Sequence, residues 1–230
     1  MMKRAALFAA MLFLVSPGLA GEQPYVTAAD LDLTAFLPRP VQAGSDADKV
    51  QLAHVLAVQK AASPDQIALA QADAEESVFD MYSRMFGPPF NPQALPQTTH
   101  LFARVGASED ATVDPAKPFF GRVRPFLANT DIQALVKPSK SGAYPSGHST
   151  RVTAVAIILT SMLPEKRDAI WMRASEYMQG RVVGGMHYQE DLDAGSRTGS
   201  ALAAAIMANP DFKADYPLVR QELRTALGLE

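Results

Sequence analysis

The sequence predicts an all-α fold, a single-domain helical bundle with a buried central helix. Apolar residues recur at helical spacing through most of the chain after residue 46, and no segment alternates apolar and polar residues for the length of a strand. Residues 152–163 are apolar on nearly every side, which is typical of a helix enclosed by others, and the stretch is too short to cross a bilayer. The chain has 230 residues, 48% of them hydrophobic, which is enough for one core.

The start of the chain has the pattern of a secretory signal. A basic segment over residues 1–4 precedes an apolar run over residues 5–15, and small residues lead to a cleavage point after Ala20. A membrane anchor needs about 18 to 20 apolar residues, and Pro17 interrupts the run before that length. We therefore expect a cleaved signal peptide over residues 1–20 and a periplasmic or secreted protein.

Residues 21–46 are rich in proline, glycine and aspartate, and they predict an N-terminal arm or loop ahead of a helical domain over residues 47–230. Helix boundaries follow from caps, prolines and glycines, such as the Ser63-Pro64 start signal and the Gly184-Gly185 break. The predicted helices cover residues 46–62, 63–85, 95–107, 115–125, 152–163, 164–181, 188–209 and 210 onward.

Charge and cysteine content narrow the possible chemistry. The formal charge is −3, and cleavage after residue 20 would remove two basic residues and no acid, leaving −5. A nucleic acid polymer is an unfavourable partner for such a surface. The chain has no cysteine, which excludes disulfides, thiolate metal ligands and a cysteine nucleophile. Catalysis would depend on His, Asp, Ser, Lys or Arg.

Four histidines are present, and two of them lie outside any motif. His54 and His100 fall in helical stretches without a chemical pattern around them, so we expect them to be dispensable surface or core-edge residues. His148 and His187 each lie within a short segment of catalytic character, described below.

The first segment runs from Lys117 through Gly121 to Arg124 and Pro125. Taken alone it is a weak signal, because most surface Lys and Arg side chains are simply solvated. Arg122 is expected to form structural ion pairs rather than to bind an anion.

The second segment, Gly142-Ala-Tyr-Pro-Ser-Gly-His-Ser, opens the buried helix. Unpaired N–H groups in the first turn of a helix, together with its dipole, suit a phosphate or sulfate ion. Ser146 can cap the helix, and Gly147 lets the backbone approach a ligand closely. An ordinary N-cap is the alternative, but it leaves His148 unexplained.

The third segment contains Arg181, His187 and Asp191. His187 and Asp191 are four residues apart, so a helix starting near His187 would let the carboxylate accept a hydrogen bond from the ring. The glycine break lets the chain bend and bring Arg181 into the same pocket. Glu190 and Asp193 flank Asp191, and we expect a solvated acidic face there rather than a metal site.

Together the three segments resemble the three-part signature of the phosphatidic acid phosphatase type 2 and vanadium haloperoxidase superfamily. Within it, the Pro-Ser-Gly-His stretch, chain length and predicted export are most similar to bacterial class A non-specific acid phosphatases. The resemblance covers residues 117–209. The chain differs from the usual pattern at Gly180, Ala143 and Ser149, which bears on substrate preference and pocket hydrogen bonds.

The resemblance implies an acid phosphatase/vanadium haloperoxidase-like fold and a metal-independent phosphatase without a cofactor. It implies that His187 is the nucleophile that forms a phosphohistidine, that Asp191 holds its ring, and that His148 is the general acid and base. The implied phosphate-binding groups are Lys117, Arg124, Ser146, Gly147 and Arg181. Since a helix N-terminus disfavours a cationic His148, we expect bound phosphate to restore its proton.

The expected substrates are small phosphate monoesters, with inorganic phosphate or vanadate as inhibitors, and no membrane partner. A homo-oligomer is expected from the resemblance. Three alternatives remain open: a phosphotransferase on the same site, a vanadate-dependent haloperoxidase, and a non-catalytic periplasmic phosphate-binding protein.

Overall fold

The computed structural model describes residues 22–229, and over that range the chain is helical with no strand, which confirms the predicted all-α class. The predicted signal peptide, residues 1–20, lies outside the described residues. The helices are α1 (Leu33–Phe36), α2 (Asp46–Ala61), α3 (Pro64–Ala72), α4 (Val78–Phe86), α5 (Pro96–Phe120), α6 (Pro125–Ala128), α7 (Gly147–Met162), a 3-10 turn (Pro164–Lys166), α8 (Arg167–Val183), α9 (Gln189–Ala208) and α10 (Pro210–Ala226).

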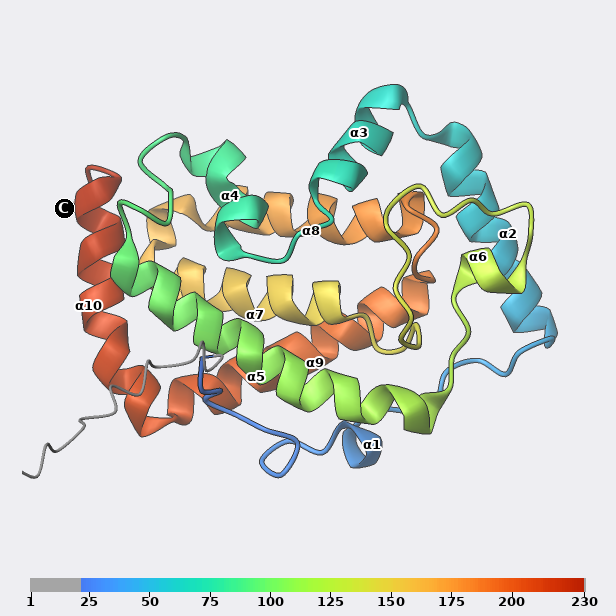
Figure 1. The fold of residues 1–230 in the computed structure, drawn as a ribbon, viewed down its shortest axis with the longest axis horizontal. Helices are drawn as coiled ribbons and strands as arrows, with labels where there is room; N and C mark the ends of the chain where they lie inside the picture. The colour runs from blue at the N-terminus through green and yellow to red at the C-terminus, as the bar shows by residue number, and fades with distance from the viewer. Residues whose placement is uncertain (1–21, 230) are drawn as a thin grey trace, which may run out of the picture.

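Helix α7 lies at the centre of the bundle, with α5, α8 and α9 around it and α10 across one end (Figure 1). Its side chains are buried on every face; Val152, Val155 and Leu159, for instance, all belong to the largest core cluster. The predicted central helix is therefore confirmed, because a helix that is apolar all round is stable only when neighbours enclose it.

Glycines let α9 pack directly against the backbone of α7. A Cβ at Gly199 would lie 2.4 Å from the carbonyl oxygen of Thr150, and one at Gly195 would lie 2.7 Å from that of Ser146. No side chain fits at these distances, so the two glycines set how closely the helices approach. This pairing holds the beginnings of α7 and α9 side by side.

The prediction of one helix over residues 63–85 is wrong, since α3 and α4 are separate. Asp73 ends α3 and forms a buried ion pair with Arg173 of α8 at 2.5 Å, while Ser77 caps the start of α4. Arg173 also donates to the carbonyl oxygen of Met81 at 2.8 Å. A single side chain from a distant helix thus holds both sides of the linker over residues 73–77.

The prediction of separate helices over residues 95–107 and 115–125 is also wrong, because α5 is continuous through Pro115 and Pro118. A proline inside a helix leaves the carbonyl four residues earlier without its usual donor. Here the backbone N–H of Ala28 donates to the carbonyl oxygen of Ala111 at 3.1 Å. The N-terminal arm therefore supplies the hydrogen bond that Pro115 lacks.

The arm is mostly irregular, but it contains α1 and is packed onto the bundle. Tyr25 and Leu33 are buried; the backbone N–H of Tyr25 donates to Ser108 Oγ at 2.8 Å, and its hydroxyl donates to Asp215 at 2.6 Å. Among residues 22–229, no helix combines the length and apolarity that a membrane span requires.

Candidate active site

All three motifs meet at one end of the bundle. The last turns of α5 and α8 and the first turns of α7 and α9 converge there (Figure 1), around a cavity of about 200 Å³. The cavity is lined by six of the eight predicted site residues: Lys117, Arg124, Gly147, His148, Arg181 and His187. Ser146 and Asp191 are fully buried behind its wall.

His187 and Asp191 form a buried pair. The Nδ1 atom of His187 lies 3.3 Å from Asp191 Oδ2, which also accepts the backbone N–H of Tyr188 at 2.8 Å. Burial first, and then the charges of Arg124 and Arg181, lower the pKa of His187 well below its usual value. Burial raises the pKa of Asp191. The neutral ring with its proton on Nδ1 is therefore favoured, which leaves the lone pair of Nε2 available.

Arg124 is held firmly against that lone pair. Its Nη1 atom lies 3.1 Å from His187 Nε2 and donates to the carbonyl oxygen of Met186, while its Nε donates to the carbonyl oxygen of Ser141 at 2.9 Å. Burial is the main reason that its pKa falls to about 10. The side chain is thus a cation positioned at His187 Nε2.

Arg181 differs from Arg124 in having donors without acceptors. It is 4% exposed, and its Nε and Nη1 atoms have no hydrogen-bond partner among residues 22–229. A buried guanidinium with unsatisfied donors is costly in free energy unless an acceptor arrives. Because Arg181 lines the cavity, an anion there would satisfy it.

Lys117 and Gly147 form the side of the cavity next to the start of α7. Lys117 Nζ donates to Asp114 at 3.0 Å and to Ser141 Oγ at 3.3 Å. A Cβ at Gly147 would lie 2.8 Å from a carboxylate oxygen of Glu109 and 3.8 Å from Lys117 Nζ. A side chain at residue 147 would therefore overlap the Glu109 carboxylate unless that carboxylate moved, whereas its distance from Lys117 Nζ would be an ordinary contact.

Ser146 caps α7, its hydroxyl accepting the N–H of Ser149 at 3.3 Å, and its own N–H donates to the carbonyl oxygen of Asp191 at 3.0 Å. These contacts use the hydroxyl within the helix cap and tie α7 to α9. Phosphate binding by Ser146 stays a prediction.

His148 has a partner that the sequence did not indicate. Its Nδ1 atom forms an ion pair with Glu76 of the α3–α4 linker, its Nε2 lies 3.3 Å from the carbonyl oxygen of Ala74, and its ring stacks on Tyr177. Burial and the charge of Arg181 lower the pKa of His148, against the opposing effect of Glu76. Burial disfavours the Glu76 carboxylate, yet His148 hydrogen bonding and nearby cations bring its pKa to about 2.

Three carboxylates at the cavity mouth share one cation. Arg151 forms ion pairs with Glu76 at 3.2 Å, Glu109 at 2.6 Å and Asp110 at 2.7 Å. These carboxylates are close enough together to hold a metal ion, but Arg151 already joins them. Burial raises the pKa of Glu109 to about 7.

Helical spacing in the sequence could have identified part of this cluster of Arg151 and its three carboxylates. Glu109 and Asp110 lie two turns before Lys117 on α5, and Arg151 lies one turn after His148 on α7. Glu76 had no such signal, because it lies in a linker whose place depends on contacts with α8.

Charged residues outside the cavity form structural contacts. The expectation for Arg122 is confirmed: it pairs with Asp48 at 2.7 Å and stacks on Tyr188. Glu190 differs from the expected solvated face, because it pairs with Arg122 at 3.4 Å and accepts the N–H of Val41. Asp193 is exposed, as are His54 and His100.

The site can be compared with known proteins. The model of the "PAP2 superfamily" matches residues 99–214. A non-specific acid phosphatase of Providencia stuartii is 30% identical over 200 residues, 84% of this chain and 81% of that protein. A non-specific acid phosphatase of Salmonella typhimurium is 31% identical over 156 residues, 64% of this chain. An acid phosphatase of Zymomonas mobilis is 33% identical over 167 residues, 69% of this chain.

These last two alignments cover only 61% and 63% of the relatives' own lengths. A bacterial vanadium-dependent iodoperoxidase has a similar fold, with a TM-score of 0.59 over 85% of this chain and 62% of its own, at 15% identity.

Proposed function

Since this chain belongs to the PAP2 superfamily, we propose that it is an exported acid phosphatase that hydrolyses phosphate monoesters through a phosphohistidine at His187. Relatives named as acid phosphatases support the reaction class. The finer parts of the proposal, export and the covalent intermediate, rest on the N-terminal sequence pattern and on the geometry of the two histidines.

The observation that carries the proposal is the unsatisfied guanidinium of Arg181. Arg181 has two buried donor atoms without a partner among the described residues, and it lines a cavity that also presents Lys117 and Arg124 and the first turn of α7. Phosphoryl transfer spreads negative charge over three equatorial oxygens, so convergent cations and N–H groups stabilise its transition state. Preformed donors cost no reorganisation during the reaction.

The first step forms the phosphohistidine. His187 Nε2 attacks phosphorus while the ester oxygen departs and takes a proton from His148. Asp191 accepts the Nδ1 proton of His187 as a hydrogen bond, which keeps the attacking lone pair on Nε2. Before this attack, as the substrate binds, Arg124 exchanges its contact with Nε2 for one with a phosphoryl oxygen, which frees the nucleophile.

The second step returns the enzyme to its starting state. His148, now neutral, takes a proton from water as the water oxygen attacks phosphorus, and the bond to His187 breaks. Phosphate leaves with the water oxygen. An alcohol in place of water would give phosphate transfer by the same path.

We expect H187A to abolish phosphate release from phenyl phosphate, and H54A to keep it within about two-fold of wild type, since surface substitutions are usually neutral. Quenched wild-type reactions should contain an acid-labile phosphoenzyme that H187A lacks, and a chelator should leave the rate unchanged.

Full activity in H187A would leave a phosphate-binding role as the better explanation. Vanadate should inhibit, and sustained bromide oxidation with vanadate and peroxide would instead favour the haloperoxidase alternative.

A further inference from the structure

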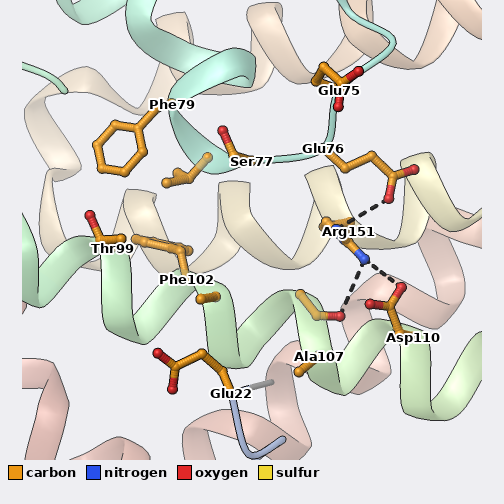
Figure 2. A pocket seen from close by; sticks show the side chains of 13 residues that line it. Glu22, Glu75, Glu76, Ser77, Phe79, Thr99, Phe102, Ala107, Asp110 and Arg151 are labelled. Carbon is orange, nitrogen blue, oxygen red and sulfur yellow. Dashed lines mark hydrogen bonds and ion pairs between the residues drawn. The ribbon is translucent and has the colours of Figure 1, made fainter. Parts of the chain in front are cut away.

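A second, larger hollow adjoins the cavity of about 200 Å³ that Arg181, His148 and His187 line, which is the phosphate cavity of the proposed reaction. It is an open groove of about 550 Å³ between α4 and α5, with α7 beneath (Figure 2). Glu76 and Asp110 line both spaces, so the groove begins where the phosphate cavity ends. The function proposed above assigns it no role.

We propose that this groove holds the alcohol portion of the substrate, and that it favours alcohols with an apolar body and a positive charge over alcohols that carry a second anion. The inference rests on the proposed phosphatase activity and adds a substrate class to it.

The position of His148 identifies which neighbouring hollow takes the leaving group. The general acid has to touch the ester oxygen, on the side of phosphorus opposite the nucleophile. His148 is paired with Glu76, which is part of the groove wall. Neither the groove nor a third hollow, beside Val123, is lined by a histidine. The Val123 hollow shares Arg124 with the phosphate cavity, and Arg124 contacts the proposed nucleophile His187. Glu76 of the groove instead contacts the proposed general acid His148.

The sizes of the two spaces agree with this division. Small-molecule sites usually measure about 300 to 1,000 Å³. The phosphate cavity falls below that range and the groove falls within it. A phosphoryl group therefore fits the first space, while a large alcohol needs the second.

The groove combines apolar sides with an acidic rim. The apolar surface lies on the sides that α4 and α5 form and consists of Val78, Phe79, Phe102, Ala103 and Ala107. The rim carries the carboxylates of Glu22, Glu75 and Asp110, as Figure 2 shows. Arg151 is the one basic side chain in the lining, and it is already paired with three carboxylates. The excess negative charge attracts a cation and repels a second anion.

The wall that carries this charge is held in place before any ligand binds. Tyr177 donates from its hydroxyl to the carbonyl oxygen of Glu75 at 2.9 Å, and Arg173 anchors Asp73 at the start of the same linker. Little ordering is therefore needed on binding, which favours selection by charge and shape.

The test compares three aryl phosphates that differ only in the para substituent: phenyl phosphate, 4-(aminomethyl)phenyl phosphate and 4-carboxyphenyl phosphate. The readout is the ratio of kcat/KM for the cationic substrate to that for the anionic one. Comparing this ratio between variants cancels the intrinsic reactivity of the esters.

The charge variant is E75K, because the Glu75 side chain forms no ion pair with any other residue in the range 22–229. We expect its ratio to fall by about three- to ten-fold at low ionic strength, and the effect to shrink as salt is added. The matched control, D65K, makes the same charge change on the exposed start of α3 and should alter the ratio by less than about two-fold.

The shape variant is A103W, which fills the groove from α5, with A204W on the exposed face of α9 as its control. We expect A103W to lower kcat/KM for 4-biphenylyl phosphate by about ten-fold, the order expected for one lost hydrophobic contact, and A204W to leave it near the wild-type value.

If E75K and D65K had equal kcat/KM ratios for the cationic and anionic substrates, and A103W and A204W had equal effects, the groove assignment would be overturned. The proposed phosphatase activity would be unaffected by that result. A change in oligomeric state of A103W by light scattering, with unchanged kinetics, would also overturn it, because the groove would then bind a second copy of the chain. Failure of wild type to hydrolyse phenyl phosphate would overturn the proposed function and the groove with it.

Discussion

His148 is subject to opposing charges from two elements. Arg181 of α8 lowers its pKa, as does burial, whereas Glu76 of the linker raises it. Tyr177 stacks on its ring, and Arg151 of α7 is paired with the same Glu76. His148 was identifiable from the motif alone, but the balance that sets its protonation state depends on Glu76, which no sequence pattern marked. We infer that Glu76 is a positioning residue that keeps the general acid protonated and oriented.

The variant E76Q tests this role through the pH profile. Loss of the carboxylate removes a contribution that raises the pKa of His148, so the general acid should lose its proton at lower pH. We expect the alkaline limb of kcat/KM to move to lower pH in E76Q and to return toward the wild-type position in E76D. The control D65N should leave the pH profile of kcat/KM unchanged. If E76Q lost activity equally at every pH and its alkaline limb did not move, Glu76 would have a structural role only.

At the scale of the helices, the pairing of α7 with α9 brings the second and third motifs together. Gly195 and Gly199 remove the side chains that would separate the two backbones. Both helices follow from local pattern: α9 begins and ends within one residue of the predicted 188–209, whereas α7 begins at residue 147 instead of the predicted 152. Their close approach does not follow from that pattern, because an isolated glycine inside a helical pattern more often signals a weak helix than a contact.

We expect G199A to lower the free energy of unfolding by about 1 to 3 kcal/mol, because its Cβ would overlap the carbonyl oxygen of Thr150. Helix propensity alone predicts the opposite sign, a gain of about 1 kcal/mol. Urea denaturation distinguishes these two predicted changes in the free energy of unfolding. The control is S200A, which changes the exposed neighbouring residue. A G199A protein as stable as S200A would show that the α7–α9 contact can relax.

For the molecule as a whole, the N-terminal arm joins parts of the fold that are distant in sequence. Tyr25 contacts α5 through Ser108 and through the guanidinium of Arg104, whose Cζ lies 3.8 Å from the ring centroid. It contacts α10 through Asp215, and Asn209 donates to its carbonyl oxygen at 2.8 Å. Composition predicted a loop here, since contacts of this kind leave no periodic signal.

We expect Y25A to lower the free energy of unfolding by about 3 to 5 kcal/mol, as for other large buried aromatic truncations. Y25F keeps the ring and loses only the hydrogen bond to Asp215, so its loss should be about 1 kcal/mol. Both are measured by chemical denaturation followed by circular dichroism. Equal stability of Y25A and wild type would mean that the arm does not contribute to the folding unit.

The sequence by itself determined the helical class and the buried central helix, and it predicted the division of the four histidines and the candidate groups for phosphate, because each depends on local periodicity or on motifs of a few residues. The tertiary structure decided where helices continue or stop and which charges meet. Helix α5 continues through Pro115 because Ala28 bonds to Ala111, and α3 stops because Asp73 pairs with Arg173. Glu76 reaches His148 for the same reason: its linker is held by α8. Contacts between residues 72 to 100 positions apart override local preference, since burial makes each of them costly to leave unmade.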